Sequence, residues 1–243
     1  MQNQFDPRPT SSGVNAASVS VPRATRDVGL RSYMLSVYNY MASGVLLTGI
    51  VAMLFASSGY AEQIMATPLR WLIVLAPLGF VMAMSFGLNR MSTGTLQTLF
   101  WAFSVAMGLS MSTIFLVYTG VSIAQTFFAV AAGFAGLSLW GYTTKKDLSG
   151  MGTFLIMGVV GLFIAMLINL FLQSTAMHLA ISAIGVLIFA GLTAYDTQRI
   201  KSIYDQVAGT DMMGKVVIMG ALNLYLDFIN MFMFLLSFMG DRR

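Results

Sequence analysis

The chain has 243 residues, of which 57% are hydrophobic and only 9% are charged, and its mean hydropathy is +0.79. Soluble domains carry about a quarter charged residues, so this composition is typical of a protein that crosses a membrane several times. The chain has no cysteine, which excludes disulfides, thiolate metal sites and cysteine nucleophiles, and the positions of its basic residues explain the net charge of +4 without a nucleic-acid partner.

The first thirty residues differ in composition from the rest of the chain. Residues 1–30 are rich in Ser, Pro and Arg and lack the apolar stretch of a cleavable signal peptide. Such a segment cannot bury enough apolar surface to fold alone. We therefore predict a disordered cytoplasmic tail over 1–30 and a transmembrane domain over 31–243.

Seven apolar segments follow, each near the roughly 20 residues that cross a bilayer as a helix. They lie at 34–56, 70–89, 97–118, 122–142, 151–172, 177–198 and 216–239. The fold class is therefore an all-α integral membrane protein with a bundle of seven transmembrane helices. The only long connection, 199–215, begins with an amphipathic pattern, which indicates that the sixth helix continues past the membrane surface.

The distribution of Lys and Arg predicts the orientation in the membrane, because cytoplasmic loops carry an excess of positive charge. With the N-terminus inside, the inner segments hold ten basic residues and the outer side holds three: Arg8, Arg23, Arg26, Arg31, Arg90, Lys145, Lys146, Arg199, Lys201 and Lys215 inside, and Arg70, Arg242 and Arg243 outside. We predict a cytoplasmic N-terminus and a C-terminus on the outer side.

One acid lies near the middle of the seventh segment. Asp227 is flanked by Asn223 four residues before it and Asn230 three residues after it, so all three side chains share one helix face. Lipid would leave these polar groups without partners, and the stripe must therefore face the bundle interior or a wet cavity. An intramembrane acid is usually functional, although a hydrogen bond between helices is the structural alternative.

A second acid, Asp196, lies near the inner end of the sixth segment, with Thr193 and Arg199 three residues to either side. An Asp–Arg pair at the membrane boundary is one interpretation. The other is that Asp196 and Asp227 face a common cavity, although the predicted boundaries place Asp196 closer to the cytoplasm than Asp227. Two close carboxyl groups titrate as a unit, and such a pair is suited to binding a cation, relaying protons or responding to pH.

The remaining candidates are basic residues and the single histidine. Arg90, at the inner end of the second segment, is either a topology anchor or a counter-ion that reaches toward the two acids. His178 begins the sixth segment at the outer side, far from both acids, so a Ser–His or His–metal site is not expected. We find no nucleotide-binding glycine pattern in its proper setting and predict that the protein is not an enzyme.

Three stretches of this sequence carry a family resemblance. "GLTAYDTQRIK" at 191–201, "ALNLYLDFINMFMFLL" at 221–236 and "GYTTKKDLSGMGTFL" at 141–155 resemble the Bax inhibitor (transmembrane Bax inhibitor motif) family over about residues 30–240. The resemblance implies a seventh helix at the centre, wrapped by the other six. It also implies a pH-sensitive calcium leak with an aspartate dyad as pH sensor and ion site, at Asp196 and Asp227. In the family an arginine after the second helix latches the dyad, and Arg90 is the candidate here.

Three functions remain open at this point. The first is a pH-gated calcium leak through a bacterial inner membrane, with the lipid bilayer and Ca²⁺ as partners and no resident cofactor. The second is an interaction protein that regulates a membrane protease or a stress or cell-death partner, with the tail over 1–30 as its handle. A proton-coupled solute transporter would use the same acids and predicts saturable uptake of an organic solute.

Overall fold

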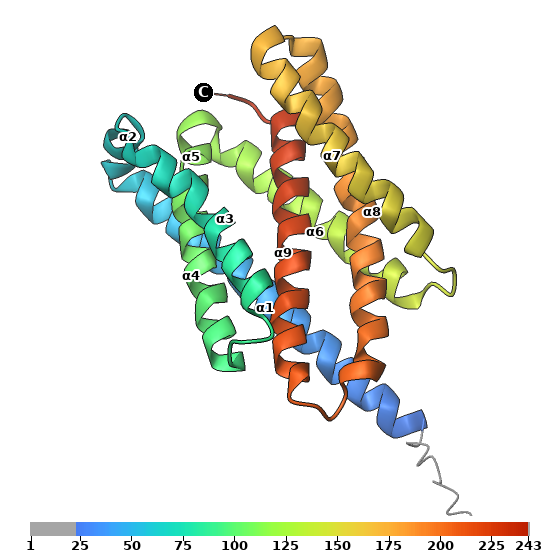
Figure 1. The fold of residues 1–243 in the computed structure, drawn as a ribbon. Helices are drawn as coiled ribbons and strands as arrows, with labels where there is room; N and C mark the ends of the chain where they lie inside the picture. Colours follow the sequence, from blue (N-terminus) through green and yellow to red (C-terminus); the bar gives the residue numbers. More distant parts are fainter. Residues whose placement is uncertain (1–22, 243) are drawn as a thin grey trace, which may run out of the picture.

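The computed structural model describes residues 23–242, which are almost entirely helical (Figure 1). The helices are α1 (Arg23–Ser57), α2 (Tyr60–Met65), α3 (Leu69–Gly87), α4 (Thr93–Met111), α5 (Ile114–Val117), α6 (Gly120–Thr143), α7 (Ser149–Leu172), α8 (Thr175–Val207) and α9 (Met212–Met239). Outside the helices, the described residues contain one isolated antiparallel bridge, between Tyr118 and Arg242.

Seven spans within the described residues are long and apolar enough to cross a membrane, with α4 and α5 together forming one span. This confirms the predicted all-α, seven-span fold. Three spanning helices begin directly after a hydroxyl side chain that accepts a hydrogen bond from a backbone N–H three residues on. These residues are Ser92 before α4, Thr119 before α6 and Ser174 before α8. Such caps satisfy an N–H group that the helix itself leaves unpaired.

The first helix begins earlier than the sequence predicts. Residues 23–30, assigned to the tail, belong to α1, whereas residues 1–22 lie outside the described residues. The early part of α1 packs against the end of α8: the Tyr33 hydroxyl donates to the Ile200 carbonyl at 3.3 Å, and Arg26 pairs with Asp205. The extension of α8 therefore gives the start of α1 a surface to fold against.

The sixth spanning helix continues past the predicted membrane boundary, as the amphipathic pattern indicated. α8 runs to Val207, and only residues 208–211 separate it from α9. Gly209 turns the chain there with φ of 76°, a conformation that glycine adopts without steric cost. The predicted long connection is thus a helix extension followed by a tight turn.

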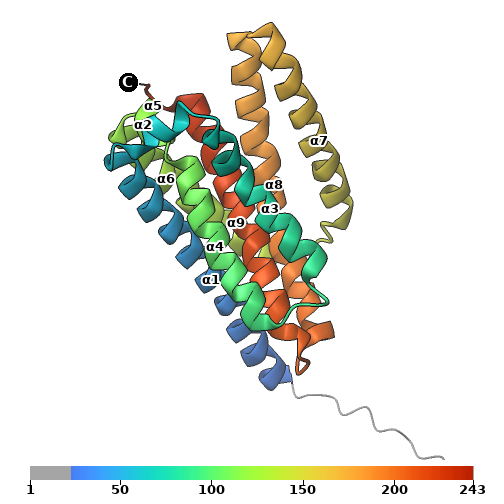
Figure 2. The ribbon, with the colours of Figure 1, turned by 60° about the vertical axis from the view of Figure 1, so that its left-hand side comes forward.

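The last helix, α9, packs closely against α1, α4, α6 and α8 (Figures 1 and 2). It is also the most deeply buried of the seven spans. By contrast, α3 packs mainly on α4 and α7 packs mainly on α8. The expectation that six helices wrap the last one therefore does not match this arrangement, in which four surround α9 and two lie further out.

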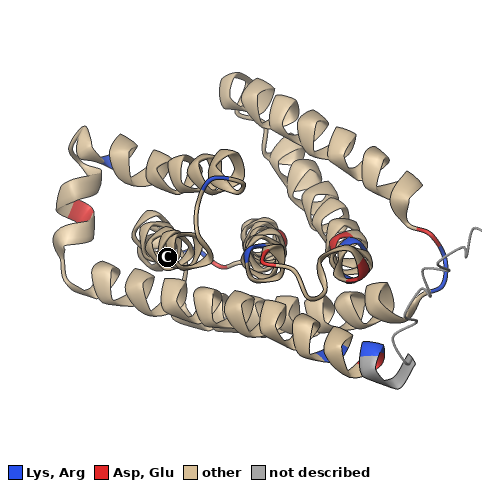
Figure 3. Cartoon of the chain, turned by 60° about the horizontal axis from the view of Figure 1, so that its bottom comes forward, with Lys and Arg blue, Asp and Glu red and all other residues tan. Residues whose placement is uncertain are grey.

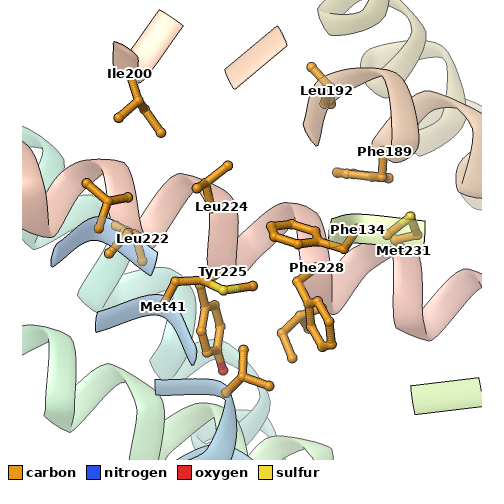
Figure 4. Close-up of a cluster of buried hydrophobic side chains, with 14 of the residues drawn as sticks. Met41, Phe134, Phe189, Leu192, Ile200, Leu222, Leu224, Tyr225, Phe228 and Met231 are labelled. Atoms are coloured by element: carbon orange, nitrogen blue, oxygen red, sulfur yellow. The ribbon is translucent and has the colours of Figure 1, made fainter. Parts of the chain in front are cut away.

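The interior between these helices is filled by apolar side chains from α1, α6, α8 and α9 (Figure 4). Phe228 of α9 lies edge-on to Phe134 of α6, with ring centres 5.6 Å apart. The outer helices instead expose large apolar side chains, such as Phe86 on α3 and Phe171 on α7. A surface of this kind is stable only in contact with lipid.

Most charged residues lie near the ends of the helices, and the middle parts of most helices carry none (Figure 3). We call the end at which α1 begins and the α8–α9 turn lies the basic end. Its described basic residues are Arg26, Arg31, Arg90, Lys145, Lys146, Arg199, Lys201 and Lys215. The opposite end, which we call the C-terminal end, holds Arg70 and Arg242.

Candidate functional site

The two intramembrane acids lie on neighbouring antiparallel helices joined by a short turn. Asp196 is eleven residues before Val207, where α8 ends, and Asp227 is fifteen residues after Met212, where α9 begins. With a rise of about 1.5 Å per residue, the difference in depth is about 6 Å. This offset is smaller than the sequence predicts, because α8 extends farther toward the turn, relative to its predicted boundary, than α9 does.

The carboxyl groups of Asp196 and Asp227 are close neighbours between α8 and α9. Asp227 is only 4% exposed, and its Oδ2 atom has no hydrogen-bond partner among the described residues. A buried polar atom without a partner costs about 1–3 kcal/mol. The arrangement is therefore not optimised for stability, which is characteristic of functional sites.

Two candidates flank Asp196 on α8 itself. The Thr193 hydroxyl is buried and donates to the Phe189 carbonyl of its own helix at 2.8 Å. Arg199 is exposed, and its charge acts on Asp196. It lies in a groove of about 260 Å³ at the basic end, beside Asp147. Hydrogen bonds from the side chain and the backbone N–H of Ser149 hold the pKa of Asp147 below its usual range.

The predicted polar stripe on α9 is present and is longer than the sequence analysis recognised. Asn223 is half-buried, and Asn230 donates from Nδ2 to the Leu226 carbonyl at 2.8 Å. Ser237 continues the same helix face, and its hydroxyl lies 3.0 Å from Nε2 of His178 on α8. The spacing of seven residues from Asn230 to Ser237 is the signal that could have shown that Ser237 belongs to this stripe.

Arg90 is not part of this cluster. It is exposed beyond the end of α3 at the basic end, and it makes no hydrogen bond or ion pair with either aspartate in the part of the chain that the structure describes. Arg199 is the cation whose charge reaches Asp196 in this arrangement.

The chemistry available at the aspartate pair is that of carboxylate oxygens. No cluster of three or more His, Cys, Asp or Glu side chains occurs within residues 23–242. Ca²⁺ takes six to eight oxygen ligands in its tight protein sites. Two carboxyl groups supply only part of such a set, which suits brief binding of a passing cation better than tight storage.

Comparison with known proteins decides the family. The family described as inhibitor of apoptosis-promoting Bax1 matches residues 30–243. The chain belongs to the Bax inhibitor-1 family. Relatives include the uncharacterized protein RP147 of Rickettsia prowazekii, 48% identical over 90% of this chain and 93% of that protein. An uncharacterized protein of Caulobacter vibrioides is 42% identical over 94% of this chain and 96% of its own length.

One relative of the Bax inhibitor-1 family carries information about location in its name. Inner membrane protein YbhL of Escherichia coli is 44% identical, over 93% of this chain and 97% of that protein. Together with the seven apolar helices, this makes the chain a multi-pass protein of the inner membrane. The prediction of which terminus faces the cytoplasm stays a prediction.

Proposed function

We propose that this Bax inhibitor-1 family member is a pH-sensitive calcium leak of the inner membrane, gated by the Asp196–Asp227 pair. One observation carries the proposal: a carboxyl group that is 4% exposed, faces a second carboxyl group and has an oxygen without a hydrogen-bond partner among the described residues. Structural hydrogen bonds between helices normally satisfy both partners. A carboxyl pair left in this state is available to a cation or a proton.

Protonation is the event that would change the state of the gate. With its charge present, the pair attracts Ca²⁺, which prefers carboxylate and carbonyl oxygens. Protonation removes that attraction and shifts the balance between open and closed bundles. Because the two groups interact, the flux follows the titration of the pair rather than of either residue alone.

The proposal is tested by Ca²⁺ flux into liposomes that contain the purified protein, measured across about pH 5 to 8. Wild type is expected to show a flux that depends on pH. Asp196→Asn and Asp227→Asn are each expected to lose this dependence on pH. Asp211→Asn is the matched control, because Asp211 is exposed in the α8–α9 turn. Flux in both dyad variants that tracks wild type at every pH would refute the mechanism.

Two arginines compete for the role of counter-ion. The geometry favours Arg199, whose charge reaches Asp196, whereas Arg90 would act as a latch only in a different arrangement of the helices. Arg199→Gln is therefore expected to change the pH profile of the flux. A change with Arg90→Gln alone would assign the latch to Arg90.

A second candidate function is an interaction protein that regulates a membrane protease or a stress or cell-death partner. The description of the matching family, which names inhibition of an apoptosis-promoting protein, favours this candidate. Deletion of residues 1–22 separates the two functions. A regulator that uses the tail as its handle loses its effect on the partner, whereas a leak keeps its ion flux.

A further inference from the structure

A polar cavity lies between α7, α8 and α9 toward the C-terminal end of the bundle. It is an open cavity of about 600 Å³, and six of its eleven lining residues are polar: Asn169, Gln173, His178, Ser182, Asn230 and Ser237. An adjoining cavity of about 410 Å³ shares four of these residues and adds Ser174, Thr175 and Arg242, which lie at helix ends. The two together lead from the end of the bundle into the membrane-spanning part.

The polar lining of this cavity differs from the apolar lining of another cavity in the same protein. A cavity of about 390 Å³ between α1, α4, α6 and α9 is almost wholly apolar, with Thr48 as its single polar side chain. An acyl chain would satisfy that surface. It would leave unsatisfied the polar atoms that have no hydrogen-bond partner among the described residues, such as Nδ2 of Asn169 and Oδ1 of Asn230, at a cost for each group. Water is the better occupant of the polar cavity.

Hydrogen bonds connect α8 and α9 at the outer part of the polar cavity. The Ser237 hydroxyl of α9 lies 3.0 Å from Nε2 of His178, and Ser182 of α8 donates to Ser237 at 3.3 Å. At the mouth, the Arg242 guanidinium is 5.9 Å from the centre of the Tyr118 ring. Arg242 lines only the adjoining cavity at the mouth, and the residues that line the larger cavity inside it include no Lys or Arg. Their amide and hydroxyl groups can hydrogen-bond the water around a small cation.

The inner end of the cavity reaches Asn230, which is three residues and about 4.5 Å along α9 from Asp227. Asn230, Ser237 and Asp227 lie on one face of that helix. The Oδ2 atom of Asp227, which has no hydrogen-bond partner within residues 23–242, is thus the next polar group along the stripe.

We propose that the polar cavity between α7, α8 and α9 is a water-filled vestibule through which a small hydrated cation reaches Asp227 from the C-terminal end. This inference rests on the proposed leak for the cation, but the access of water to Asn230 can be tested without any flux. It assigns to His178, Ser237 and Asn230 the lining of the entrance, a role distinct from the binding of the ion by the two aspartates.

Cysteine labelling tests the vestibule directly, because the chain has no cysteine of its own. Asn230→Cys and Ser237→Cys are compared with Leu187→Cys. Leu187 is the control because it lies at nearly the same depth as Asn230 but faces lipid, where it is 71% exposed. The depth follows from the Ser182–Ser237 contact: seven residues further inward, α8 has reached Phe189 and α9 has reached Asn230. Leu187 is two residues from Phe189. Each variant is reconstituted in liposomes with a charged methanethiosulfonate reagent on both sides, and modification is followed by mass.

Thiols react as thiolates, which form in water and not in hydrocarbon. The vestibule predicts that Asn230→Cys and Ser237→Cys react at least about tenfold faster than Leu187→Cys. If Asn230→Cys reacts as slowly as Leu187→Cys while Ser237→Cys reacts fast, the water stops short of Asn230 and the proposal is wrong. Slow reaction of both refutes the vestibule altogether. Elution of each variant as wild type in size exclusion guards against misfolding.

A flux measurement then separates this inference from the proposed function. A positively charged adduct on Asn230→Cys is expected to abolish the Ca²⁺ leak, whereas the same adduct on Ser58→Cys, exposed at the same end beyond α1, leaves it unchanged. If modified Asn230→Cys still leaks like the unmodified variant, the cavity is not the entrance for the cation. If wild type passes no Ca²⁺, the proposed function fails, and labelling alone decides whether the vestibule exists.

Discussion

The Thr48 hydroxyl shows how the interior holds polar groups that have no part in the proposed gate. Its oxygen lies 2.7 Å from the Tyr225 hydroxyl of α9, and it donates to the Ser104 carbonyl of α4 at 2.8 Å. Three helices are thus joined by one side chain of α1. Thr48 and Tyr225 are buried and both are satisfied, which is the expected state of structural hydrogen bonds.

Substitution of Thr48, which bonds both Ser104 and Tyr225, is expected to lower the free energy of unfolding more than substitution of Tyr225. Thr48→Val strips the Tyr225 hydroxyl of its partner and is expected to destabilise the fold by about 1–2 kcal/mol. Tyr225→Phe is expected to cost less, because Thr48 keeps its bond to Ser104. Thermal or denaturant unfolding in detergent measures both variants. Equal losses would show that the Thr48–Ser104 bond adds nothing.

At the aspartate pair, a substitution is expected to leave the free energy of unfolding unchanged or to raise it. Asp227→Asn keeps the shape of the side chain but removes a buried acid whose Oδ2 atom has no hydrogen-bond partner in the described part of the chain. A group kept for function rather than stability can be replaced without loss, so the variant is expected to be as stable as wild type or more stable. Unfolding in detergent gives the answer. Destabilisation by 2 kcal/mol or more, on the order of a lost buried network, would make Asp227 a structural bond between helices.

At the scale of elements, close approach of α6 to α8 places Asp196. A Cβ atom added at Gly141 would lie 2.3 Å from the Ala194 carbonyl oxygen, two residues before Asp196. At Gly136, on the same helix, an added Cβ meets nothing within 4 Å. Only the absence of a side chain at Gly141 lets α6 and α8 pack at this distance.

This contrast gives a matched pair of variants. Gly141→Ala forces α6 away from α8 and is expected to destabilise the fold by about 1–3 kcal/mol. Gly136→Ala is expected to be neutral or slightly stabilising, because alanine is the better helix former. The midpoint of unfolding in detergent compares the two. A neutral Gly141→Ala would mean that the helices separate at no cost.

Sequence reasoning could predict the elements better than their contacts. Seven apolar runs of the right length identify the spans, and the amphipathic pattern after Arg199 indicates the extension of α8. The pattern could not place α3 and α7 outside the ring around α9, because both are uniformly apolar and a helix exposed to lipid looks like a buried one.

The same limit applies to the candidate site. Composition alone singles out Asp196 and Asp227, since charged residues within apolar runs are rare. Their proximity depends on how α8 and α9 end at the turn over 208–211, which helix boundaries from sequence do not fix. The contact between His178 and Ser237 escaped notice because neither residue is unusual on its own helix, and only the antiparallel pairing brings them together.

For the whole molecule, the difference in positive charge between its two ends predicts how the bundle is oriented in the membrane. The described basic end carries eight Lys and Arg residues, whereas Arg70 and Arg242 stand at the C-terminal end. Basic residues close to the membrane resist translocation, so the basic end is expected to face the cytoplasm. The C-terminus and the mouth of the proposed vestibule then both lie on the outer side.

Reporter fusions at the C-terminus test this orientation. In a bacterial host, an alkaline phosphatase fusion is expected to be active, because that enzyme matures outside the cytoplasm, and a green fluorescent protein fusion is expected to be dark. A fusion of each reporter to the α6–α7 loop, next to Lys145 and Lys146, is the internal control and should give the reverse result. A bright C-terminal fluorescent fusion with an inactive phosphatase would invert the bundle and make the polar cavity open to the cytoplasm.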